Sequence, residues 1–94
     1  MTTRATSTAR LKAVIETDRR RIAAGERPRY HATWTLSPSS GATDVRIVEL
    51  PLVHLFVPAP SDVLDGARVL VARTLGTDPV AFDVTPADPA GHQP

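Results

Sequence analysis

The sequence has 94 residues, 41% of them hydrophobic and 22% charged, with a net charge of +1, which fits one globular domain with a modest core. It has no cysteine, which excludes disulfides, cysteine-based zinc sites and a thiol nucleophile and fits a reducing compartment. Residues 1–10 hold no apolar run, and no stretch reaches the ~20 apolar residues of a membrane span, so we expect a cytoplasmic protein without a signal peptide.

The N-terminal part is expected to comprise a disordered segment, 1–6, and a basic helical segment, 7–29. The helix should begin near Ser7 and stop at Gly25. Its apolar stripe is narrow, and Asp18 interrupts it, so the helix is expected to be weakly anchored. The stripe consists of Leu11, Val14, Ile15 and Ile22.

Three strands are predicted next. Tyr30 to Leu36 alternates between apolar and polar residues, as half-buried strands do, and a second strand should run from about Thr43 to Glu49. Leu52 to Val57 is apolar on both faces apart from His54, which indicates that both faces of this third strand are covered. The connections are short enough for an antiparallel meander.

A second helix should begin at Ser61, which is a favourable cap, and stop at Gly76. Alternation then predicts a last strand over 80–85, and the Pro-rich segment 86–94 is expected to be a disordered tail. The order is α-β-β-β-α-β, an α+β domain in which helices pack on a four-stranded sheet. The second helix is a crossover that can place the last strand parallel to a neighbour.

Three segments of residues 30–85 together carry a family resemblance: Leu50-Pro51 before a strand, the helix start Ser61-Asp62-Val63-Leu64-Asp65-Gly66-Ala67-Arg68, and Leu75-Gly76-Thr77-Asp78-Pro79-Val80-Ala81-Phe82-Asp83-Val84. They resemble the HicB-like antitoxin family. The resemblance implies a bacterial or phage-like small protein with a degenerate ribonuclease-H-like fold that has lost catalysis. It also implies homo-oligomers and the binding of a small toxin ribonuclease in a toxin-antitoxin system. Family members commonly carry Gly after the Leu-Pro, where this chain has Leu52.

No catalytic or metal-binding constellation stands out. His31 and His54 could meet on neighbouring strands, but no cysteine or close histidine pair supports a metal site, and His92 lies in the predicted tail. Asp44 and Glu49 lie five residues apart along one predicted strand, so their side chains should point to opposite faces. The acidic residues considered for a two-metal nuclease site are Asp44, Glu49, Asp65 and Asp83. We therefore expect no enzymatic activity, no cofactor and no metal.

The second and third strands carry more apolar residues than one buried face needs, which indicates a partner or dimer interface. The residues predicted to form it are Val48, Leu50, Leu52 and Phe56. The N-terminal helix, a sister chain in a homodimer or a toxin would each produce this pattern in the sequence.

Charge is distributed unevenly along the chain. Residues 1–29 hold eight basic and three acidic residues, a net charge of +5, whereas residues 30–94 hold three basic and seven acidic residues, a net charge of −4. A solvated helix face explains the basic segment, and binding of a phosphate backbone is the alternative. The candidate nucleic-acid contacts are Arg19, Arg20, Arg21, Arg27 and Arg29.

Two functions follow from these patterns. The favoured one is a non-catalytic, homodimeric protein-binding domain whose acidic segment helps it to occlude a basic toxin ribonuclease. The alternative is a small nucleic-acid-binding protein that uses its Arg-rich N-terminal helix. Neither function requires contact with a membrane.

Overall fold

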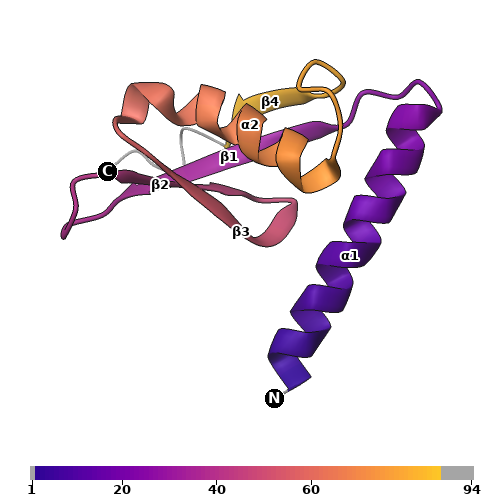
Figure 1. Cartoon of the computed structure of the whole chain (residues 1–94), viewed down its shortest axis with the longest axis horizontal. Coiled ribbons are helices and arrows are strands. Elements are labelled where there is room, and N and C mark those ends of the chain that lie inside the picture. The colour runs from indigo at the N-terminus through magenta and orange to yellow at the C-terminus, as the bar shows by residue number, and fades with distance from the viewer. Residues whose placement is uncertain (1, 88–94) are drawn as a thin grey trace.

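The computed structural model describes the backbone of residues 2–87 and the side chains of residues 8–87. It confirms the predicted α+β class and the order α-β-β-β-α-β (Figure 1). The elements are α1 (Thr2–Ala23), β1 (Arg29–Leu36), β2 (Thr43–Ile47), β3 (Leu50–Val57), the 3-10 helix η1 (Pro60–Asp62), α2 (Val63–Leu75) and β4 (Asp83–Pro86).

The two ends of the chain differ from the expectation. Helix α1 begins at Thr2, so residues 2–6 are helical although the segment 1–6 was predicted to be disordered. Residues 2–24 contain neither Pro nor Gly, and nothing in the sequence stops the helix there. In the predicted tail 86–94, Pro86 belongs to β4, while residues 88–94 and Met1 lie outside the described residues.

The strands form one sheet in the order β3-β2-β1-β4. Strands β1, β2 and β3 pair antiparallel in sequence, which confirms the meander, and Trp34 lies opposite Val45, which lies opposite Leu55. Strand β4 pairs parallel with β1, with Arg29 opposite Asp83, as the crossover through α2 allows. Strands β3 and β4 are therefore the two edges of the sheet.

Helix α2 covers one face of the sheet and forms the core with it. Its close approach depends on Gly66, where an added Cβ would lie 2.6 Å from Cγ1 of Val57 on β3. Gly76, at φ 65°, ends the helix in the left-handed conformation. The buried apolar residues are Tyr30, Ala32, Val45, Ile47, Leu50, Val57, Val63, Ala67, Leu70, Val71, Leu75 and Phe82.

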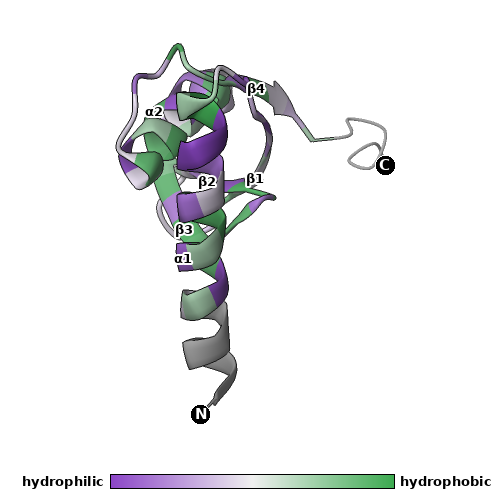
Figure 2. Cartoon of the chain, turned by 90° about the vertical axis from the view of Figure 1, so that its right-hand side faces the viewer, coloured by the Kyte–Doolittle hydropathy of each residue, from purple (hydrophilic) through white to green (hydrophobic). Residues whose placement is uncertain are grey.

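Helix α1 packs against one end of this core and contacts β3 and α2. It lies beside β3 in both views and runs past the sheet (Figures 1 and 2). Its partly buried apolar residues are the predicted stripe, Leu11, Val14, Ile15 and Ile22. The predicted stripe does anchor the helix, but only along part of its length.

The prediction that both faces of β3 are covered is wrong. Leu52, His54 and Phe56 are exposed and alternate with the half-buried Val53 and Leu55, as expected for a strand with one covered face. The face of the sheet opposite α2 carries no helix within residues 2–87. The apolar side chains of Leu52 and Phe56 are each more than half exposed.

Strand β3 is irregular near its start. Ile47 pairs with Leu50, whereas the preceding Arg46 pairs with His54, so β3 holds extra residues at this register shift. Leu52 lies in this bulge with φ 71°, a left-handed conformation that favours glycine. Pro51, which cannot donate to a ladder, also falls in the bulge.

Candidate binding surfaces

A buried acid attaches α1 to the sheet. The hydroxyl of Tyr30 donates to Asp18 Oδ2 at 2.6 Å, and Arg21 Nη1 lies 3.6 Å from Asp18 Oδ1. Asp18 is only 7% exposed, although the sequence pattern marked it merely as an interruption of the apolar stripe. Burial raises the pKa of Tyr30, and the hydrogen bond to Asp18 raises it further. The available sequence signal was an acid at a core-facing helix position with a tyrosine at the start of the next strand.

Two of the five candidate nucleic-acid contacts form hydrogen bonds with other residues of the same chain. Arg21 Nε donates to Glu26 Oε1 at 3.0 Å. Arg27 donates to the carbonyl of Val80 at 2.7 Å and to Asp83 Oδ1 at 2.8 Å. The remaining candidates, Arg19, Arg20 and Arg29, are exposed, and their guanidinium groups form no hydrogen bond or ion pair with residues 8–87.

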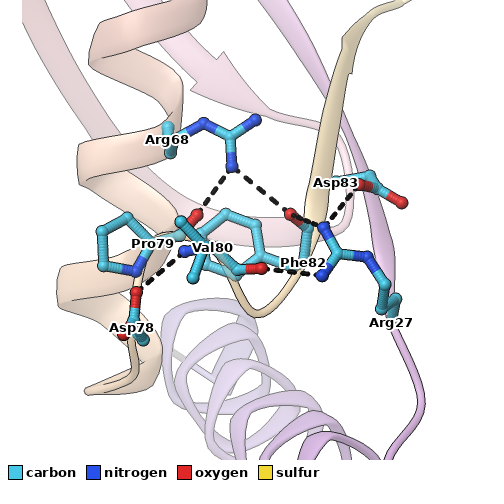
Figure 3. Close-up of polar contacts among 7 residues, drawn as sticks. All are labelled: Arg27, Arg68, Asp78, Pro79, Val80, Phe82 and Asp83. Atoms are coloured by element: carbon cyan, nitrogen blue, oxygen red, sulfur yellow. Dashed lines mark hydrogen bonds and ion pairs between the residues drawn. The ribbon is translucent and has the colours of Figure 1, made fainter.

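A second arginine secures the segment before β4 (Figure 3). Arg68 Nη1 donates to the carbonyls of Pro79, at 2.6 Å, and Phe82, at 3.3 Å. Its guanidinium carbon lies 5.7 Å from the centre of the Phe82 ring, a cation–π distance. The backbone N–H of Val80 donates to Asp78 Oδ1 at 3.0 Å. Arg27 and Arg68 thus fix this loop from two different elements.

These contacts correct the predicted last strand. The carbonyls of residues 79, 80 and 82 accept bonds from arginine side chains, and β4 begins only at Asp83. Val80 is 66% exposed rather than on a buried strand face, whereas Phe82 is fully buried. The Phe82 ring meets Tyr30 edge to face, with centres 5.7 Å apart. The hydrogen bond from Arg27 lowers the pKa of Asp83.

The uncovered sheet face carries two separate histidine–carboxylate pairs. His54 Nδ1 lies 3.0 Å from Asp44 Oδ1, and Arg46 Nη2 donates to Asp44 Oδ2 at 3.0 Å. Burial alone would raise the pKa of Asp44, but the hydrogen bonds from His54 and Arg46 outweigh it, and the pKa is lowered. His31 instead pairs with Glu49 through both its backbone N–H and its ring.

The candidate catalytic residues do not come together. Asp44, Glu49 and Asp83 each pair with different groups, and Asp65 is exposed on α2. Within the described part of the chain no group of three or more His, Asp or Glu side chains could hold a metal ion. That part of the structure also has no pocket. His92 lies outside the described residues.

The predicted apolar interface divides between core and surface. Leu50 is 1% exposed and belongs to the core, so its assignment to an interface is wrong. Val48, Leu52 and Phe56 are 60%, 57% and 54% exposed. The ring of Phe56 contacts that of His54, with centres 5.4 Å apart. Leu50 pairs with Ile47, whereas Leu52 lies within the bulge, residues 51–53, that follows it.

Strand β3 is an edge strand of the sheet, and helix α1 contacts it. Residues 50–57 include no charged side chain. Within residues 2–87, no backbone group of residues 52–57 hydrogen-bonds outside the ladder with β2. We call the outer backbone of residues 52–57, together with the side chains of Leu52, His54 and Phe56, the β3 edge.

Unpaired acidic side chains lie at the start of α2, away from the β3 edge. The carboxylates of Asp62 and Asp65, at the start of α2, form no hydrogen bond or ion pair with residues 8–87. Leu64 between them is 42% exposed. This short acidic and apolar surface lies beyond the end of β3, separate from the β3 edge.

Comparison with known proteins identifies no relative: no family model, curated protein or solved structure matches the chain. Neither helix described in residues 2–87 is long and apolar enough to span a bilayer.

Proposed function

We propose that this chain is a non-catalytic protein-binding domain, similar to a HicB-like antitoxin, that occludes a small basic toxin ribonuclease in the cytoplasm. The observation that carries the protein-binding role is the β3 edge, where a strand without charged residues exposes more than half of Leu52 and of Phe56. Apolar surface that its own chain leaves uncovered favours a protein partner.

The backbone at Leu52 supports the resemblance to the antitoxin family. The family commonly has Gly after the Leu-Pro, and Leu52 at this position adopts φ 71°, which glycine adopts without strain. At position 52 the chain therefore differs from the family in its side chain, whereas its backbone has a conformation that glycine readily adopts. The order α-β-β-β-α-β and the strand order β3-β2-β1-β4 are also compatible with the fold that the resemblance implies.

The acidic start of α2 suits a basic partner. The carboxylates of Asp62 and Asp65 have no partner among residues 8–87 and flank the exposed Leu64. Complementary charge speeds encounter with a basic protein, while a neighbouring apolar side chain provides contact area. Occlusion of the toxin by this surface requires no catalytic group in the antitoxin.

The test is capture and release of a partner. The tagged chain, incubated with nuclease-treated extract of its native cells, should retain a small basic protein in stoichiometric amount. That protein should cleave RNA once freed and lose this activity when the chain is added back. The double variant Asp62→Asn with Asp65→Asn should retain less of it, whereas the control Glu16→Gln, also an exposed acid, should not differ from the wild type. Capture that disappears on nuclease treatment would overturn the proposal.

Nucleic-acid binding is the second candidate function, favoured by Arg19, Arg20 and Arg29, whose guanidinium groups are exposed and unpaired within residues 8–87. Under this function, replacing Arg19 and Arg20 by Ala should weaken binding to a single-stranded oligonucleotide. Loss of both phosphate contacts should reduce the slope of log affinity against log salt by about 1.4. Arg73→Ala, an exposed arginine on α2, is the matched control.

A further inference from the structure

We infer that three arginines gathered around Asp83, at the start of β4, form a binding site for a phosphomonoester group carried by a partner protein. The arginines are Arg27, Arg29 and Arg68. Strand β4 is the edge of the sheet opposite β3, so this site goes beyond the β3 edge used in the proposed function.

The three arginines come from different segments and meet at the first residue of β4. Arg27 donates to Asp83 Oδ1 at 2.8 Å. Arg29 lies opposite Asp83 in the parallel pair of β1 and β4, so both side chains leave the sheet on the same face. Arg68 arrives from α2 and donates to the carbonyl of Phe82, the preceding residue (Figure 3). The hydrogen bond from Arg27 is the main cause that lowers the pKa of Asp83, and the positive charges of all three arginines lower it further.

The site holds more positive charge than it neutralises. Within residues 8–87, Asp83 is the only acid that forms an ion pair with any of the three arginines, and it pairs with Arg27 alone. Asp78 of the same loop accepts a backbone N–H instead. Three positive charges against one negative charge leave a local net charge of +2. Arg27 and Arg68 also bond the same carbonyl oxygen at 3.3 Å each, so their nitrogens lie at most twice that distance apart and repel each other.

Hydrogen-bond donors remain available at this excess charge. Arg68 bonds only through Nη1, so its Nε and Nη2 have no partner among residues 8–87, and this pair of donors can hold an oxyanion by two parallel hydrogen bonds. The Phe82 ring, 5.7 Å from the guanidinium carbon, limits the orientation of that group. The guanidinium of Arg29 is exposed and has no hydrogen bond in the same range of residues. The donors are therefore positioned before any anion arrives, which lowers the cost of binding one.

The excess charge indicates which anion fits. A phosphomonoester carries a charge of about −1.5 to −2 at pH 7, which matches the local net charge. A carboxylate, or the phosphodiester of a nucleic-acid backbone, carries a single negative charge and would neutralise only half of it.

The surroundings of the site favour a protein as the carrier of the phosphate. The described part of the chain has no pocket that could enclose a small molecule. The loop that the arginines hold exposes Pro79 and Val80, which are apolar side chains against which a protein chain can pack. Its one aromatic residue, Phe82, is fully buried and offers no ring on which a base could stack.

Titration of the 15N-labelled chain with a short phosphoserine peptide, followed by NMR, tests the inference. The backbone amides of residues 80–84 and the Nε–H of Arg68 should shift and saturate. The affinity should be about tenfold or more above that of the same peptide with aspartate in place of phosphoserine, because the dianion gains a second charged contact.

Three variants separate binding from support of the loop. Arg29→Gln removes no side-chain hydrogen bond within residues 8–87, so it should weaken binding about tenfold and leave the thermal midpoint unchanged. Asp83→Asn should strengthen binding, because it raises the local positive charge while its amide oxygen can still accept from Arg27. Arg73→Gln, at an exposed position on α2, is the control and should bind like the wild type.

Each other result overturns the inference. Lack of saturation, or equal affinity for the phosphoserine and aspartate peptides, excludes a phosphomonoester site. Shifts centred on Arg19 and Arg20 would reveal unspecific attraction to α1, and an Arg29→Gln variant that binds normally would show that the arginines only hold the loop. A 5′-phosphorylated oligonucleotide that binds these residues more tightly than the peptide would replace the protein partner by a nucleic-acid end. These titrations need no toxin, so failure to capture one from extract would remove the proposed function without affecting their result.

Discussion

Leu52 offers a direct test of the energetic cost of its left-handed backbone, which has φ 71°. A non-glycine residue in this conformation is destabilised by about 1–2 kcal/mol, and glycine avoids this strain but loses about 0.5–1 kcal/mol more conformational freedom on folding than alanine does. Leu52→Gly and Leu52→Ala remove the same side chain, so its contacts cancel in the comparison, including any made in a dimer. The Gly variant should therefore be the more stable of the two, by roughly 0.5–1 kcal/mol.

The assay is equilibrium unfolding in urea, followed by the fluorescence of Trp34, the only tryptophan. A difference of 1 kcal/mol corresponds to about 4–8 °C in the thermal midpoint of a domain this small. Thr33, half-buried on β1, provides the control, because at an ordinary strand position the Ala variant should be more stable than the Gly variant. If Leu52→Ala proves at least as stable as Leu52→Gly, the strain argument is refuted.

Three further predictions concern Tyr30, Gly66 and Asp44. Tyr30→Phe should cost about 1–3 kcal/mol in urea unfolding, because buried Asp18 loses its donor. The folded-state pKa of Tyr30 is raised, so its contribution to stability is fully present below about pH 10 and is lost as pH rises further. The absorbance of this residue, the only tyrosine in the sequence, should therefore titrate above about pH 10. Titration at about pH 10 would contradict its burial. Gly66→Ala should lower the thermal midpoint, because the new Cβ meets Val57 at 2.6 Å, and an unchanged midpoint would show that α2 can move away from β3. The pKa of Asp44 is lowered, so its contribution to the stability of the domain is present above about pH 3.9 and fades as pH falls below that value. Asp44→Asn should therefore reduce the slope of the unfolding free energy against pH in acid. An unaltered slope would count against the ion pairs of Asp44.

Local patterns predicted the elements whose signals lie within the element itself. Strand β1 follows from clean alternation, and α2 from a broad apolar stripe with Gly76 at its end. The start of β4 could not be placed this way. Val80 extends the alternation of Phe82, yet the backbone there is held by Arg27, 53 residues away along the chain from Val80. Contacts at such separation leave no local pattern in a single sequence.

The candidate interface was only partly predictable for a related reason. Leu50 and Leu52 have the same side chain and lie two residues apart, so simple alternation would place both on one face of β3. The bulge instead leaves Leu50 in the core and Leu52 on the surface. The role of Asp18 depends on Tyr30, across a turn and on another element. The sequence pattern indicated that the apolar surface of β3 would contact a partner. Which acidic side chains are free could be determined only from the structure, which gives the ion pairs of Asp44, Glu49 and Asp83.

The parallel pairing of β1 with β4 also has a consequence for the order in which the domain is made. Residues 29–32 find one of their two neighbouring strands only in residues 83–86, which lie 54 residues further along the chain. Closing such a distant contact costs loop entropy before it returns stability, which slows folding. On the ribosome, β1 remains an open edge until residues 83–86 have emerged, so both sides of the β1–β3 meander stay unpaired while the residues between β3 and β4 are made.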